Sequence, residues 1–326
     1  MIPHKFKFLK LFFEIFGIIA CAVAFLFFLS PNKFINTFRF FPNYNPFAKN
    51  IEQTIEAVGQ DMSTVLKSSE LRKTQLAMND GSMRNVIVYL PKGYNPKGNR
   101  IYPSLYMLHG SPGQETDWLT AGKAKESLDG AILAKILPPT VVVFPDGNGG
   151  ATNDTQYINS TDGSQLDEDF IIKTVVGYVD NNFLTIKEAK FRAIGGLSSG
   201  GFGAINLALR HQDIFGNVVA LSGYGIIDQN VLSGRLIQGS QQTIHNNTPL
   251  DYIPSLTTTS TKLILIVGRN DNSVIAENRA LETALAKKGF DVTLTLANGV
   301  HNWKFWSEHL PDGLSWLGRQ FKSLKK

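Results

Sequence analysis

The feature that most constrains the fold of this chain is the alternation of short apolar segments with segments of helical length after residue 104. A short apolar run bounded by turn residues is typical of a buried strand. Strands that alternate with helices form a mostly parallel sheet with helices on both faces. The predicted strands are residues 104–108, 141–144, 191–195, 218–221, 262–267 and 291–296, and the predicted helices are residues 121–135, 166–182, 201–210, 273–288 and 303–321.

Two further segments belong to the same α/β domain, which we expect over residues 71–326. Residues 71–78 and 83–90 are strand-like, and the turn sequence Asn79-Asp80-Gly81-Ser82 between them predicts a β-hairpin. Residues 225–261 break the alternation. This segment is predicted to be an irregular insertion over the sheet.

The N-terminal residues 1–30 form a separate segment. Lys5, Lys7 and Lys10 precede the apolar residues 11–29, which contain the single charge of Glu14. As a helix this run would be about 28 Å long, close to the ~30 Å hydrocarbon layer of a bilayer. We therefore predict an N-terminal apolar helix that acts as an uncleaved membrane anchor. A cleaved signal peptide and a lipoprotein signal are the alternatives.

The lysines also predict where the catalytic body lies. Three lysines precede the apolar run, against Lys33 and Arg39 close after it, which favours an N-terminus in the cytoplasm and a body outside it. We expect an extracytoplasmic protein, either membrane-anchored or secreted. Residues 31–70 are predicted to be a linker with a short helix. The single Cys21 forbids an internal disulfide.

The composition excludes several classes of protein. The chain of 326 residues is 43% hydrophobic and 18% charged, which is typical of a globular protein rather than a disordered one. Its 32 Lys and Arg residues against 27 Asp and Glu are scattered and form no basic stripe, so we expect no nucleic-acid partner. No Cys/His cluster has the spacing of metal ligands, and we expect no metal and no cofactor.

The motif that carries chemistry is Gly196-Leu197-Ser198-Ser199-Gly200, which lies between a predicted strand and a predicted helix. This is the G-x-S-x-G pattern of a nucleophile elbow. A serine on so sharp a turn needs small neighbours, and the helix that follows offers free N–H groups to an oxyanion. The alternative is a Gly-rich turn with no catalytic role. The placement of the motif favours Ser198 as a nucleophile.

A base and an acid for this serine follow from the order of the strands. Hydrolases of this build have the order Ser, acid, His, each after a strand. Asp271 and His301 follow two successive predicted strands, so they are expected to meet Ser198 at the carboxyl edge of the sheet. Glu277 is the alternative acid.

The sequence resembles the Putative esterase family of α/β-hydrolases, which includes feruloyl and acetylxylan esterases, S-formylglutathione hydrolases and mycolyltransferases. The matching stretches are residues 86–94, 102–110, 143–147, 196–204 and 221–223. The resemblance implies an α/β-hydrolase fold with Ser198 as nucleophile, His301 as base and Asp271 as acid. It also implies an oxyanion hole made by the backbone N–H groups of Ser111 and Ser199. Many relatives have Met after the nucleophile, but since only the N–H is used there, Ser199 is expected to have little effect.

The expected function is that of a serine carboxylesterase that hydrolyses a small-molecule, carbohydrate or lipid ester through an acyl-enzyme. An acyltransferase that passes the acyl group to a sugar or lipid alcohol is one alternative. A non-catalytic anchored binding domain is another. Trp118, Trp303 and Trp306 are expected either to line an acyl pocket or to pack in the core.

Overall fold

The computed structural model describes residues 68–148, 154–228, 240–257 and 259–323. All of these belong to one unit, Lys67–Lys326. The predicted anchor over residues 1–30 and nearly all of the predicted linker over residues 31–70 lie outside the described residues. Within the described ranges, no helix combines the length and the apolar character needed to cross a membrane.

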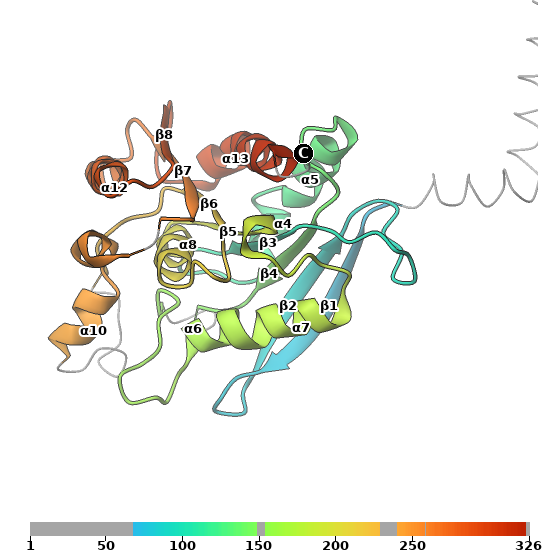
Figure 1. Cartoon of the computed structure of the whole chain (residues 1–326), viewed down its shortest axis with the longest axis horizontal. Helices are drawn as coiled ribbons and strands as arrows, with labels where there is room; N and C mark the ends of the chain where they lie inside the picture. The colour runs from blue at the N-terminus through green and yellow to red at the C-terminus, as the bar shows by residue number, and fades with distance from the viewer. Residues whose placement is uncertain (1–67, 149–153, 229–239, 258, 324–326) are drawn as a thin grey trace, which may run out of the picture. The chain divides into compact units, whose positions relative to one another are not determined.

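A single sheet forms the centre of the described part of the chain (Figure 1). Its eight strands lie in the order β1-β2-β4-β3-β5-β6-β7-β8. They are β1 (Glu70–Ala77), β2 (Met83–Leu90), β3 (Ser104–Leu108), β4 (Val141–Pro145), β5 (Arg192–Leu197), β6 (Asn217–Leu221), β7 (Lys262–Gly268) and β8 (Val292–Ala297). β2 pairs antiparallel with β1 and β4, and every other pair is parallel. The predicted hairpin and the mostly parallel sheet are confirmed.

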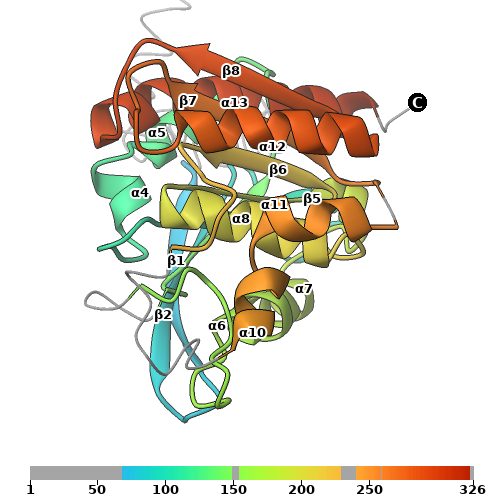
Figure 2. The same ribbon diagram turned by 90° about the vertical axis from the view of Figure 1, so that its left-hand side faces the viewer.

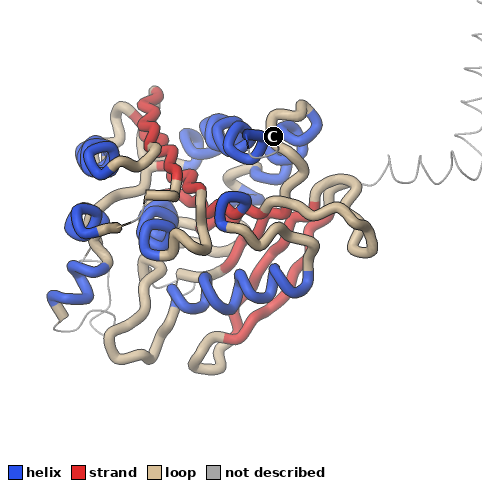
Figure 3. Tube along the Cα trace, in the orientation of Figure 1, coloured by secondary structure: helices blue, strands red, loops and turns tan. Residues whose placement is uncertain are grey.

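Helices cover both faces of this sheet, as the alternation predicted (Figure 3). They are α4 (Asp117–Thr120), α5 (Ala124–Leu133), α6 (Asp167–Asp169), α7 (Val176–Asn182), α8 (Ser199–Arg210), α10 (Gln241–Asn246), α11 (Pro249–Tyr252), α12 (Ile275–Lys288) and α13 (Trp303–Ser323). Figures 1 and 2 show α5 and α13 on one face, with α7 and α8 on the other.

The pleat of the strands divides the core into two parts. In β2, Val86 and Val88 face the core beneath α7, α8 and α12, whereas Ile87 and Tyr89 face the core beneath α5 and α13. Successive side chains of a strand point to opposite faces, so a strand buried on both faces is apolar along its length. This is why β2, β3 and β4 carry continuous apolar runs.

Four local expectations differ from the structure. The predicted helix 121–135 is the shorter α5, Ala124–Leu133, because Lys123 just before it has a left-handed φ of 48°, and the short α4 before the predicted start was not expected. The predicted helix 166–182 contains a π-helical stretch, Phe170–Val175, between α6 and α7. The predicted insertion is less irregular than expected, since its described residues include α10 and α11. The helix after the nucleophile motif begins at Ser199, two residues before the predicted start.

Candidate functional site

Ser198 lies in a sharp turn between β5 and α8. Its φ of 53° and ψ of −122° are rarely adopted by a residue with a side chain. A Cβ atom added to Gly196 would lie 2.3 Å from the carbonyl oxygen of Gly200, and one added to Gly200 would lie 2.3 Å from that of His109. No side chain fits at such distances. The expectation that this turn needs small neighbours is therefore confirmed.

The structure brings together the three side chains that the sequence placed after different strands. His301 Nε2 lies 2.8 Å from Ser198 Oγ, and His301 Nδ1 lies 2.9 Å from Asp271 Oδ2. A carboxylate only accepts hydrogen bonds, so Nδ1 carries the proton of the neutral ring. Nε2 is then the acceptor for the hydroxyl of Ser198, and the ring has the tautomer that a general base requires.

The carboxylate of Asp271 is held by more than the histidine. Its side chain is completely buried, and Ser273 Oγ donates a hydrogen bond of 2.6 Å to Oδ1. Burial alone would raise the pKa of Asp271, but hydrogen bonds from His301 and Ser273 outweigh burial and hold this pKa below its usual range. Asp271 is therefore ionised beside the imidazole at neutral pH.

Glu277, the alternative acid, has a different task. Its Oε2 accepts hydrogen bonds from the backbone N–H groups of Gly225 and Ile226, at 2.9 Å and 3.0 Å. It therefore holds the loop after β6 rather than the imidazole. Of the two acids weighed from the sequence, Asp271 is the one that contacts His301.

The three tryptophans form a row of edge-to-face contacts that ends on His301. Trp306 lies 5.0 Å from the imidazole, between ring centroids, and Trp303 contacts both Trp306 and Trp118. Trp118 and Trp306 are 1% and 6% exposed, so they pack in the core, and only Trp303 is partly exposed. Through Trp306, the row packs against the imidazole of His301.

The predicted oxyanion donors lie in segments next to Ser198. Ser199 is the first residue of α8, where backbone N–H groups have no partner in the preceding turn. Ser111 belongs to the loop after β3, which approaches the nucleophile closely. A Cβ atom added to the neighbouring Gly110 would lie 3.5 Å from Ser198 Cβ.

The sequence analysis missed several polar residues around this site. Ser273 had a local signal, because it follows Asp271 by two residues in an Asp-x-Ser turn. Ser222 had none, although it is fully buried with a left-handed φ of 47°. Asn148 had none either. Its side-chain amide donates to Ser199 Oγ across 51 positions of sequence.

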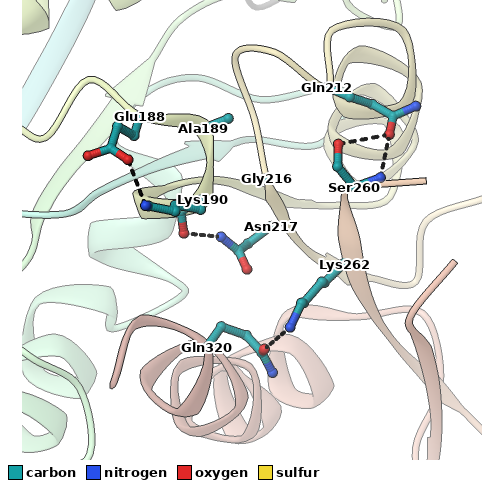
Figure 4. Close-up of a pocket in the computed structure, with 9 residues that line it drawn as sticks. All are labelled: Glu188, Ala189, Lys190, Gln212, Gly216, Asn217, Ser260, Lys262 and Gln320. Atoms are coloured by element: carbon teal, nitrogen blue, oxygen red, sulfur yellow. Dashed lines mark hydrogen bonds and ion pairs between the residues drawn. The ribbon is translucent and has the colours of Figure 1, made fainter. Parts of the chain in front are cut away.

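The described residues also line a cavity of about 320 Å³ at the opposite, amino edge of the sheet (Figure 4). Lys190 pairs with Glu188 there, and Lys262 donates to Gln320 Oε1. Within the described ranges, no group of three or more His, Cys, Asp or Glu side chains is arranged to hold a metal ion. No serine–histidine pair lies in this cavity.

The sequence profile of the family described as Putative esterase matches residues 78–317. The chain belongs to this family. The family resemblance predicted from the motifs is therefore confirmed. The match extends from the turn of the β1–β2 hairpin into α13, so it includes every element that carries a residue of the site.

Individual relatives agree with this family. The chain is 36% identical over 149 residues to an endo-1,4-beta-xylanase/feruloyl esterase of Xylanibacter ruminicola, a match that covers 44% of this chain and 20% of that protein. It is 24% identical to an acetyl esterase of Caldicellulosiruptor saccharolyticus, over 66% of this chain and 83% of that enzyme. A solved ferulic acid esterase has the same fold, with a TM-score of 0.69 and 23% identity over 78% of this chain and 99% of that one.

Proposed function

We propose that this chain is a serine carboxylesterase in which Ser198 is the nucleophile, His301 the general base and Asp271 the acid that orients it. The observation that carries the proposal is the continuous hydrogen-bond chain from Ser198 Oγ through both nitrogens of His301 to Asp271. A binding domain would gain nothing from a serine held in a strained turn against an imidazole. Family membership supports the same reaction.

The mechanism follows from these contacts. Ser198 Oγ attacks the ester carbonyl carbon as His301 Nε2 takes its proton. The imidazolium that forms is stabilised by the buried carboxylate of Asp271. The negative charge on the former carbonyl oxygen is stabilised by the N–H groups of Ser111 and Ser199. His301 then protonates the leaving alcohol, and a water molecule activated by the same nitrogen hydrolyses the acyl-enzyme.

The substrate class we propose is a small-molecule ester, with acetyl and hydroxycinnamoyl groups as the first acyl groups to test. The names of two relatives, an acetyl esterase and a feruloyl esterase, support this choice. Ile226 lies in the loop after β6 that Glu277 holds, and Val300 directly precedes His301. Both side chains are exposed and would offer apolar contact to such an acyl group.

The experiment is hydrolysis of p-nitrophenyl acetate and methyl ferulate by the full chain in detergent. We expect Ser198→Ala and His301→Ala each to lose at least about 10⁴-fold in kcat, since the members of such a triad act together. Ser82→Ala, which changes an exposed serine in the β1–β2 turn, is the control and should keep full activity. A Ser198→Ala variant as active as the wild type would overturn the proposal.

We also propose that the esterase works outside the cytoplasm, anchored by residues 1–30. The lysine-flanked apolar run supports this location. Digestion of intact and of lysed cells by an added protease tests it. A body that is protected in intact cells and cleaved only after lysis would contradict an anchored protein facing outward.

A further inference from the structure

The loop after β4 places a buried amide beside the nucleophile turn. Asn148 is 1% exposed, and its Nδ2 donates to Ser199 Oγ at 3.2 Å and to Asp154 Oδ1 at 3.0 Å. Its Oδ1 accepts from both the N–H and the hydroxyl of Thr155, at 2.9 Å and 3.0 Å. Both donors and the acceptor of this amide are therefore used, so the side chain has one orientation.

Asp154 connects this amide to the other side of the site. Its carboxylate accepts hydrogen bonds from Asn148 and from the backbone N–H of Gln156, the latter at 3.0 Å. The side chain of Ser111, in the loop after β3, makes a further hydrogen-bond contribution that lowers the pKa of this carboxylate. Burial raises the pKa of Asp154, and these three hydrogen bonds act against that rise.

The two residues at the ends of this network are the two predicted oxyanion donors. Asn148 links Ser199 to Asp154 by two hydrogen bonds, and Ser111 lies near enough to Asp154 to lower its pKa. The sequence assigned Ser199 only a backbone N–H group, with no effect of its side chain. In the structure Ser199 is 2% exposed, and its hydroxyl accepts a hydrogen bond from Asn148. A Met at this position could not make that hydrogen bond.

We propose that Asp154 is a positioning residue of the oxyanion hole, whose carboxylate sets the spacing of the Ser111 and Ser199 N–H groups through Ser111 Oγ and Asn148. This inference rests on the proposed esterase function. An oxyanion hole acts only when its donors are aimed at the transition-state oxygen, and small displacements of such groups cost rate without weakening substrate binding. Asp154 itself touches no reacting atom.

The test compares Asp154→Asn with a matched control, Asp162→Asn, on p-nitrophenyl acetate. Asp162 belongs to the same connecting segment and also accepts from serine hydroxyls, those of Ser160 and Ser164, but it is exposed. We expect Asp154→Asn to lose about 10–100-fold in kcat with KM within about twofold, less than the 10²–10³ of a deleted donor. Asp162→Asn should equal the wild type.

Inhibition by an aryl trifluoromethyl ketone distinguishes positioning of the oxyanion hole from a purely structural role of Asp154. The ketone forms a tetrahedral adduct with the serine, whose oxyanion occupies the hole. Its inhibition constant should rise for Asp154→Asn in parallel with the fall in kcat/KM. Unchanged kinetics, or a fall in kcat with an unchanged inhibition constant, would overturn the inference.

A second pair of variants keeps the test decisive if Asp154→Asn does not fold. Ser111→Ala and Ser199→Ala each remove one end of the network and leave both backbone N–H groups in place. Each should raise the inhibition constant of the ketone by a smaller factor than Asp154→Asn does. The double variant should approach the rise seen in Asp154→Asn. No weakening in the double variant would overturn the inference. Full activity of Ser198→Ala would instead overturn the esterase proposal, so the two failures are distinguishable.

Discussion

The two edges of the parallel sheet differ in how they hold their polar side chains. At the carboxyl edge, Asp271 is completely buried, and Ser198 and Ser222 have left-handed φ angles of 53° and 47°. At the amino edge, the cavity is lined by ordinary surface pairs such as Lys190 and Glu188, which are 53% and 61% exposed. Strained and buried groups cost free energy and persist where the surroundings enforce them. This difference supports our proposal that the chemistry takes place at the carboxyl edge, although the cavity of Figure 4 lies at the amino edge.

The sharpest test of this difference is at Asp271. We expect Asp271→Asn to lower kcat by about 10³–10⁴-fold, because an amide does not fix the His301 tautomer or stabilise the imidazolium. Steady-state hydrolysis of p-nitrophenyl acetate measures this loss. Glu277→Gln is the matched control, because an amide oxygen still accepts from the Gly225 and Ile226 N–H groups, and we expect it to stay within about tenfold of the wild type. Equal losses of kcat in both variants would contradict the assignment of Asp271 as the acid.

A third region tests whether burial of a charge is enough to mark a functional site. Glu168, 5% exposed, accepts hydrogen bonds of 2.6 Å from Arg210 Nη1 and from His211 Nε2, at the far end of α8 from Ser198. We expect Glu168→Gln to lower the free energy of unfolding by about 2–4 kcal/mol, because it removes the buried carboxylate that accepts from Arg210 and His211. The kcat should not change. Urea unfolding measures the stability, and hydrolysis by the same preparation measures kcat. A large loss of kcat in a folded variant would show that Glu168 has a functional role as well as a structural one.

The same carboxylate predicts a pH dependence. Burial alone would raise the pKa of Glu168, but the hydrogen bond from His211 and the charge of Arg210 hold it below its usual range. A carboxyl whose pKa is lower in the folded state stabilises the fold above its unfolded pKa of about 4.3, and that contribution is lost as the pH falls through the folded value. The difference in free energy of unfolding between wild type and Glu168→Gln should therefore become smaller as the pH falls from 6 to 3. A constant gap would contradict the assigned pairing.

The smallest effect is expected at the amino edge. Lys262 lies 3.6 Å from Asp291 and donates to Gln320, all near the surface. Exposed pairs of this kind contribute about 0–1 kcal/mol, so Lys262→Ala and Lys190→Ala should each shift the free energy of unfolding by under about 1 kcal/mol. Hydrolysis should stay within about twofold. A tenfold loss of hydrolysis in either variant would show that this cavity takes part in the reaction.

The fold was predictable because its signals are local. A buried strand such as β3 is apolar at every position, and its predicted bounds match the observed Ser104–Leu108. The errors arose where backbone conformation departs from a regular period. The left-handed Lys123 delays the start of α5 to Ala124, and the π-helical Phe170–Val175 interrupts a helix that the sequence pattern continues. The spacing of hydrophobic residues along the sequence does not encode either of these changes in backbone conformation.

The sequence by itself determined the order of strands and helices, the strained turn at Ser198 and the placing of Asp271 and His301 after successive strands. These follow from glycine sterics and from the shared direction of parallel strands. Only the tertiary structure decided that Asp271 rather than Glu277 meets His301, and that Asn148 joins Ser199 to Asp154. Such choices depend on side-chain directions across segments distant in sequence. They are settled when the loops pack, because buried polar groups must each find a partner.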